Sequence, residues 1–120
     1  MNAIFLTFLV AVAGGVGAAL RFAIDMSIPT NIRERFPWGT WVINVSGSFA
    51  LGLVAGPLAA VVWGPVVTVG LLGGYTTFST ASLEAVSLFE DGRWLTGLLY
   101  VLGTLVICTL AALAGLTLTA

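Results

Sequence analysis

The sequence predicts an all-α membrane protein with four transmembrane helices, and three observations carry that prediction. Of the 120 residues, 59% are hydrophobic and only 8% are charged. The mean hydropathy of +1.12 is typical of the membrane class, because too few polar side chains remain to cover a soluble globule. A helix crosses a bilayer with about 20 apolar residues. Four such spans fit in one transmembrane domain, residues 1–120, at roughly 3–24, 39–60, 65–89 and 94–118.

The composition also excludes several kinds of function. With four arginines, no lysine and a net charge of −1, the chain has no basic patch for nucleic acid. It has no histidine, its single cysteine lies inside the fourth span, and the spans hold no pair of carboxylates. Enzymatic activity is therefore not expected. The expected surroundings are membrane lipid, in a plasma membrane or a bacterial inner membrane.

The first and second spans each contain polar groups that need a partner. Arg21, near the end of the first span, must snorkel to the interface, pair with another group or face water. Asn44 lies in the first turns of the second span. Its amide either makes an interhelical hydrogen bond, worth about 0.6 kcal/mol on average in membranes, or lines a polar pore.

The third span is interrupted by the most informative stretch of the chain. Residues 73–80 combine two glycines and five hydroxyl side chains within an otherwise apolar segment. A broken helix persists inside a bilayer only where protein buries it or where it lines a wet cavity, and ion sites are often built at such breaks. Glu84 follows in the same span, either as a proton-coupling group or, as we favour, in a structural role.

The fourth span carries a polar stripe. Tyr100, Thr104 and Cys108 recur every four residues and therefore share one helix face. The stripe either makes polar contacts along a pore, or its threonine hydroxyl bonds back to the carbonyl four residues earlier, which is the commoner case. Four short, glycine-rich helices enclose little space, so a conduit is expected to need a second copy. The weak arginine bias between the loops permits insertion in both orientations.

Three motifs, taken together and in order, resemble the Fluc/CrcB family of fluoride channels. They are residues 14–21 (GGVGAALR), 39–52 (GTWVINVSGSFALG) and 73–80 (GGYTTFST) followed by Glu84. The resemblance implies a passive path that exports the fluoride ion through an antiparallel, dual-topology homodimer with a broken third helix. It further implies a structural Na⁺ at the dimer centre, held by the backbone carbonyls of Gly73 and Thr76 in each subunit.

The resemblance also implies which side chains meet the anion. Phe78 would present the positive edge of its ring, Asn44 an amide donor, and Arg21 a charge that concentrates anions at a vestibule. The complete set of expected fluoride-path residues is Arg21, Asn44, Phe78, Ser79, Thr80, Tyr100, Thr104 and Cys108.

Ala81 departs from the family pattern, which commonly has a second phenylalanine at this position. Either the chain is one subunit of a heterodimeric channel, or, as we favour, Thr80, Ser82 or the stripe of the fourth span replaces the missing contact in a homodimer. A third alternative, a proton-coupled small multidrug transporter, has a similar length but would need a carboxylate in the first span. None is found within residues 3–24.

Overall fold

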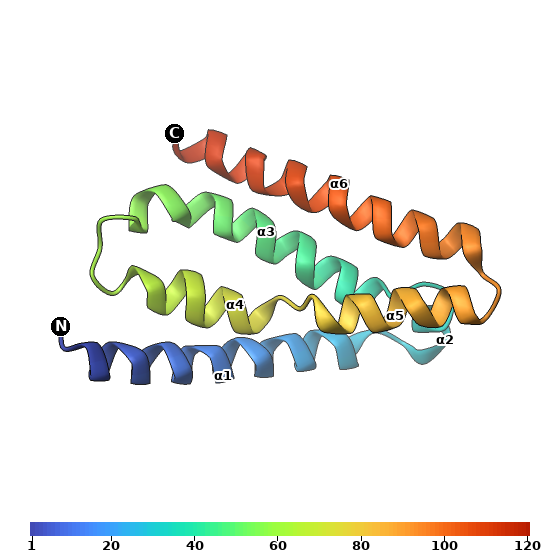
Figure 1. The fold of residues 1–120 in the computed structure, drawn as a ribbon, viewed down its shortest axis with the longest axis horizontal. Helices are drawn as coiled ribbons and strands as arrows, with labels where there is room; N and C mark the ends of the chain where they lie inside the picture. Colours follow the sequence, from blue (N-terminus) through green and yellow to red (C-terminus); the bar gives the residue numbers. More distant parts are fainter.

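The computed structural model describes all 120 residues, and every regular element in it is helical. Figure 1 shows four long rods: α1 (Ala3–Ser27), α3 (Trp38–Leu58), a composite rod over residues 66–90, and α6 (Trp94–Thr119). All four are long and apolar enough to cross a membrane, which confirms the prediction of four membrane-spanning helices. Both chain ends lie at one end of the bundle, and the short helix α2 (Thr30–Arg33) lies at the other.

Local sequence signals set the helix boundaries. The side chain of Asn2 accepts a 2.7 Å hydrogen bond from the backbone N–H of Ile4 and so caps the start of α1. Pro29 disfavours helical backbone at the residue before it, and α1 ends two residues earlier. Gly92 has a positive φ of 77° in the turn before α6, a conformation that glycine adopts without strain.

The third rod is made of three helical segments. A π-helical segment, η1 (Val66–Leu71), leads directly into α4 (Leu72–Tyr75), and α5 (Ser79–Glu90) completes the rod. Residues 76–78 between α4 and α5 are not helical, and Thr76 has an extended backbone with ψ of 160°. Figure 1 shows this stretch as a narrow connection at about the middle of the rod. Backbone groups here must find partners outside the helix.

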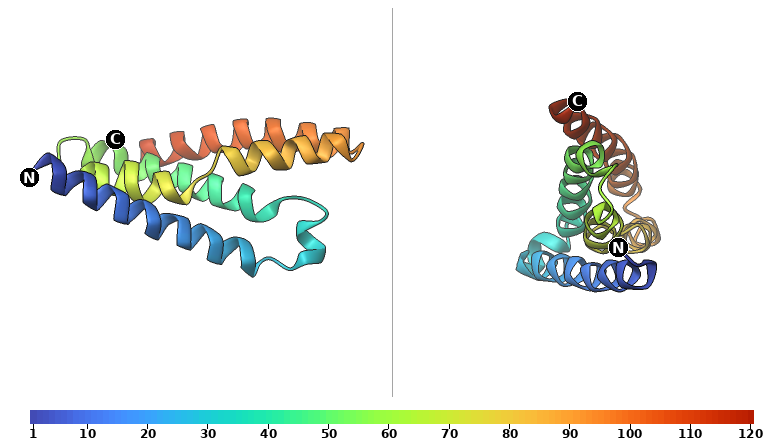
Figure 2. Two further views of the ribbon diagram at one scale, coloured as in Figure 1. Left: turned by 60° about the horizontal axis from the view of Figure 1, so that its bottom comes forward. Right: turned by 90° about the vertical axis from the view of Figure 1, so that its left-hand side faces the viewer.

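Glycines set how the rods pack. Figure 1 shows the rods from top to bottom in the order α6, α3, η1 to α5, and α1, and both views of Figure 2 place α6 and α1 on opposite sides of the bundle. A side chain on Gly74 would collide with the backbone of Gly14 in α1, and one on Gly115 in α6 would collide with the backbone of α3 at Phe49. Close backbone contact of this kind is how membrane helices associate without a hydrophobic driving force.

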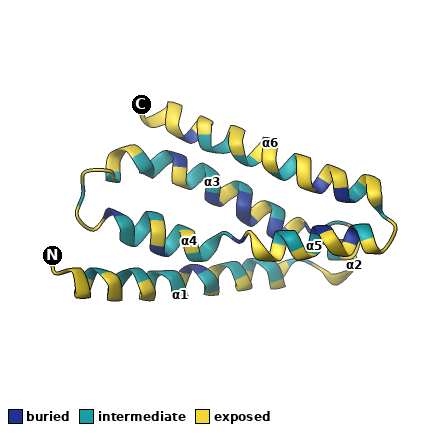
Figure 3. Cartoon of the chain, viewed as in Figure 1, coloured by how far each residue is buried: buried dark blue, intermediate teal, exposed yellow.

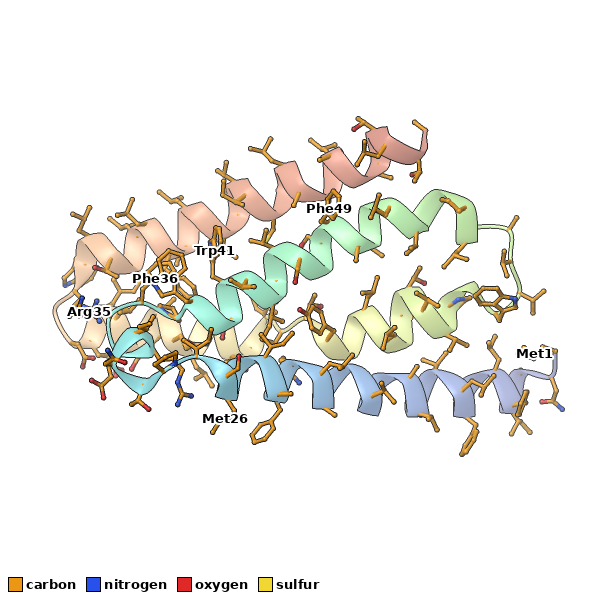
Figure 4. The ribbon with its side chains drawn as sticks, turned by 180° about the vertical axis from the view of Figure 1, so that it is seen from behind. Met1, Met26, Arg35, Phe36, Trp41 and Phe49 are labelled. Atoms are coloured by element: carbon orange, nitrogen blue, oxygen red, sulfur yellow. The ribbon has the colours of Figure 1, made fainter.

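Few side chains are buried within the single chain. The most enclosed large ones are Ile43 and Tyr100, each 1% exposed, and the buried positions follow the inner faces of the rods in Figure 3. Phe36 packs edge-on against Tyr100 with ring centroids 5.3 Å apart, and it lies near Trp41 in Figure 4. The outer faces are apolar and exposed, as expected of surfaces that lipid or another subunit covers.

Candidate functional site

The interruption between α4 and α5 is held by one buried side chain. The amide nitrogen of Asn44 donates to the carbonyl of Thr77 at 2.9 Å, and its Oδ1 accepts from the backbone N–H of the same residue at 2.8 Å. A single amide from α3 therefore replaces two helical hydrogen bonds. One amide hydrogen of Asn44 is left over, because the side chain carries two.

Two carbonyls lose their helical donors at the interruption. In a continuous α-helix the N–H of Thr77 would donate to the carbonyl of Gly73, and that of Thr80 to the carbonyl of Thr76. Instead, the N–H of Thr77 donates to Asn44, and the N–H of Thr80 donates to the Thr77 hydroxyl at 3.1 Å. The carbonyls of Gly73 and Thr76 are thus left without these bonds, at membrane depth.

A cleft opens beside these carbonyls, and we call it the break cleft. It has a volume of about 320 Å³ and lies between α3, α4 and α6. The structure brings six of the predicted site residues together there. They are Asn44, Gly73, Thr76, Phe78, Thr104 and Cys108.

Thr104 behaves differently from the three threonines that follow it in α6, Thr109, Thr117 and Thr119. Thr109 donates to the carbonyl of Leu105 and Thr117 to that of Ala114, whereas the buried hydroxyl of Thr104 has no hydrogen-bond partner. The back-bonded alternative considered for the stripe is therefore wrong at Thr104. Thr104 lines the break cleft, and its buried hydroxyl is left without a partner there.

The ring of Phe78 points away from its own subunit. Its side chain is 88% exposed, although it lies in the middle of the third rod and lines the break cleft at its edge. Most of this ring therefore makes no contact within the chain.

A second cleft lies on the α1 side of the interruption, and we call it the inner cleft. Arg21 and Thr80 line it together with Thr40 and Thr77, and its volume is about 360 Å³. Thr77 also lines the break cleft, so this residue forms a wall between the two. Arg21 and Thr80 therefore lie near the interruption but on the opposite side from Thr104 and Cys108.

A third cleft, the outer cleft, continues toward the α2 end of the bundle. It has a volume of about 360 Å³, and none of its eight lining residues is hydrophobic. Asp25, Arg33 and Glu84 are among them. Asp25 and Arg33 form the only ion pair in the chain, with Nη1 of Arg33 3.8 Å from Oδ2 of Asp25.

The structure separates two predicted path residues from the clefts. Tyr100 is enclosed between α5, α3 and the α2 to α3 loop, where its hydroxyl has no partner. Ser79 is exposed and lines none of the three clefts. The stripe of α6 thus divides, because Thr104 and Cys108 face the break cleft while Tyr100 packs with Ala85 and Leu88.

Glu84 is bonded to a hydroxyl rather than to an arginine. Its Oε1 accepts a short 2.5 Å hydrogen bond from Thr40 of α3, which ties α5 to α3. Ala81, one turn earlier, packs against the cluster that contains Tyr100. The small side chain at 81 therefore faces the interior of its own subunit.

Sequence reasoning missed several residues of the site. Thr77 was visible only as one hydroxyl in the run 73–80, and its role depends on Asn44, 33 residues away. Thr40 precedes Asn44 by one helical turn, a spacing that could have indicated a shared face. Asp25 was placed outside the first span, but α1 extends to Ser27 and includes it. The prediction that the first span holds no carboxylate is therefore wrong, because α1 contains Asp25 in its last turn.

The four apolar helices and the polar clefts between them define a multi-pass helical membrane protein. The family model described as "CrcB-like protein, Camphor Resistance (CrcB)" matches residues 8–116, and the chain belongs to this family. This confirms the family that the three sequence motifs indicated.

Relatives that are named as fluoride channels match over nearly the whole chain. The "Fluoride-specific ion channel FluC 2" of Nitrobacter hamburgensis is 44% identical over 115 residues, which cover 92% of this chain and 93% of the relative. The "Fluoride-specific ion channel FluC 3" of Brucella suis is 40% identical over 116 residues, with 91% and 87% covered. The "Fluoride-specific ion channel FluC" of Magnetococcus marinus is 38% identical over 112 residues, with 89% and 91% covered.

Proposed function

We propose that this protein is a passive fluoride-selective channel that exports cytoplasmic fluoride and so lowers its toxicity. The observation that carries the proposal is its similarity, over about nine tenths of both chains, to proteins named as fluoride-specific ion channels. The function involves no catalysed reaction, because these relatives are ion channels. Hydrogen fluoride crosses bilayers uncharged and dissociates inside, so an anion path is enough for export. A membrane potential drives it with about 2.3 kcal/mol per charge per 100 mV.

The break cleft supplies donors suited to a small, strongly hydrated anion. The remaining amide hydrogen of Asn44, the unpartnered hydroxyl of Thr104 and the ring edge of Phe78 lie around one cleft. Ring hydrogens carry partial positive charge. Several weak donors let an anion leave as readily as it binds, which conduction requires. Arg21, in the inner cleft, raises the local anion concentration.

The proposed working form is an antiparallel, dual-topology homodimer. Support comes from Phe78, whose ring is 88% exposed at mid-bundle and would complete a path in a second copy. Gly73 likewise has open space beside it. In this proposal the interruption of the third rod is the broken helix of the family, and the pores form between the two copies.

The carbonyls of Gly73 and Thr76 are proposed to hold a structural Na⁺ at the dimer interface. They fit this ion because their helical donors are diverted to Asn44 and Thr77, and unwound carbonyls commonly coordinate Na⁺ in membrane proteins. When bound, the ion would supply positive charge where unpaired carbonyl dipoles would otherwise be buried. The side chains of Asn44 and Thr77 would only orient these carbonyls, because the two side chains accept hydrogen bonds from the N–H groups that would otherwise donate to the carbonyls.

The two alternatives have weaker support. A proton-coupled drug transporter needs a carboxylate deep in the first span, whereas Asp25 lies in the last turn of α1 and is already paired with Arg33. A heterodimer would account for Ala81, but the interior packing of this residue gives no reason for a second kind of subunit.

The test is ion release from liposomes that contain only this chain. With a K⁺ ionophore to clamp the voltage, we expect fluoride release without a proton gradient and no release of chloride. Release that needs a proton gradient, or transport of a lipophilic cation, would contradict the channel. Fluoride release only after a second polypeptide is added would contradict the homodimer.

A further inference from the structure

The inner and outer clefts meet at two residues. Asp25 and Thr80 are the only residues that line both of them. The inner cleft continues to Thr77 at the interruption, and the outer cleft opens among the charged residues near α2. A solute that moves from the α2 end of the bundle to the interruption along these clefts must pass Asp25.

The carboxylate of Asp25 is held in place from two sides. Its Oδ1 packs against Gly39 in the first turn of α3, so closely that any side chain at position 39 would collide with it. On the other side, the guanidinium of Arg33 lies 3.8 Å away. The side chain is 40% exposed, and its charge therefore acts on solutes in both clefts.

The charges that face this junction do not favour an anion. In the outer cleft Arg33 is accompanied by Glu34 and Glu84, and in the inner cleft Arg21 is the single cation. Arg33 is the group that offsets Asp25. A negative charge at a narrow approach lowers the local concentration of anions and hence their rate of arrival.

We propose that Asp25, with Arg33 as its counter-charge, sets the rate at which anions reach the interruption from the α2 end. This inference rests on the proposed fluoride channel. The substitution Asp25→Asn removes the repulsion and leaves Arg33 unopposed, so anion flux rises. Arg33→Gln leaves Asp25 uncompensated, so flux falls.

The experiment compares fluoride release from liposomes for wild type, Asp25→Asn and Arg33→Gln. Glu90→Gln is the matched control, because Glu90 is exposed and lines none of the clefts described. At an ionic strength of about 0.01 M, where screening reaches about 30 Å, we expect Asp25→Asn to be at least about threefold faster and Arg33→Gln at least about threefold slower. At about 1 M salt, where screening acts within about 3 Å, the four proteins should converge.

The outcomes separate this inference from the function on which it rests. If wild type releases fluoride but both variants match it at low salt, Asp25 has no role in the flux and the inference is wrong. If the differences persist unchanged at high salt, their cause is structural and the inference is also wrong. A wild type that releases no fluoride overturns the proposed function and this inference with it. If Asp25→Asn fails to fold, Arg33→Gln alone tests the inference. Fluoride release that is slower than wild type at low salt and equal to it at high salt supports the inference, and release equal to wild type at low salt contradicts it.

Discussion

Asn44 gives the clearest link between one side chain and the local backbone. The sequence left its amide between an interhelical hydrogen bond and a pore lining; the structure shows the interhelical hydrogen bond, and the pore lining stays a prediction. It bonds to Thr77 through nitrogen and oxygen, and it also lines the break cleft. No pattern within α3 could have predicted the partner, because the bond joins residues 33 positions apart.

The substitution Asn44→Asp tests this double role. An aspartate would place a second acceptor, negatively charged, against the carbonyl of Thr77, in a buried position. An unsatisfied buried group costs about 1–3 kcal/mol, and more when it is charged. We therefore expect at least a tenfold loss of fluoride release from liposomes and a lower melting temperature in detergent.

The matched control for this prediction is Asn31→Asp, the same chemical change at an exposed position in α2. It should behave like wild type in both measurements. If the two variants have the same fluoride release and the same melting temperature, the side chain of Asn44 has only an incidental packing role.

At the scale of elements, the hydrophobic spans and the hydroxyl-rich run were readable from sequence, but the packing was not. The number of apolar helices follows from the length and hydropathy of each segment. The predicted spans missed two features. The π-helical segment Val66–Leu71 depends on neighbouring rods, and the end of α1 at Ser27 depends on Pro29. Spacing alone could not show that Tyr100 is separated from Thr104 and Cys108. Helix α5 covers Tyr100, whereas Thr104 and Cys108 line the break cleft.

The close contact between α1 and α4 predicts that a single methyl group added at Gly74 lowers the stability of the protein markedly. In Gly74→Ala the new Cβ would overlap the backbone of Gly14, which cannot move aside as a side chain would. Such overpacking typically costs about 1–3 kcal/mol. The measurement is the thermal unfolding midpoint in detergent, which should fall.

Two further glycines serve as controls, because an added Cβ on Gly15 or Gly56 would meet no atom within 4 Å beyond the adjacent backbone of its own helix. Gly15→Ala and Gly56→Ala should leave the midpoint unchanged or raise it, since alanine favours helix over glycine by up to about 1 kcal/mol. A midpoint for Gly74→Ala as high as those of the controls would show that α1 and α4 are not in backbone contact.

At the scale of the whole molecule, the single chain leaves two features of the proposed channel without partners. The ring of Phe78 is 88% exposed, and the carbonyls of Gly73 and Thr76 lack their helical donors. The proposed dimer and its Na⁺ would complete both at once.

The sodium proposal predicts a linkage between the ion and assembly. A ligand that binds only the assembled protein stabilises it in proportion to the logarithm of its concentration. Replacing Na⁺ with a large organic cation should therefore lower the dimer fraction and the melting temperature, and both should recover when Na⁺ is titrated back. If dimer fraction and melting temperature do not change between the two cations, the carbonyls of Gly73 and Thr76 hold no structural ion.

The central claim, a passive and selective fluoride path, is tested most directly by the reversal potential of currents through the purified protein in a planar bilayer. With a tenfold fluoride gradient and equal chloride on both sides, the current should reverse near the fluoride equilibrium potential, about 59 mV for a single charge. A pH gradient should leave this value unchanged. A reversal potential near zero, or one that moves with the pH gradient, would contradict the account.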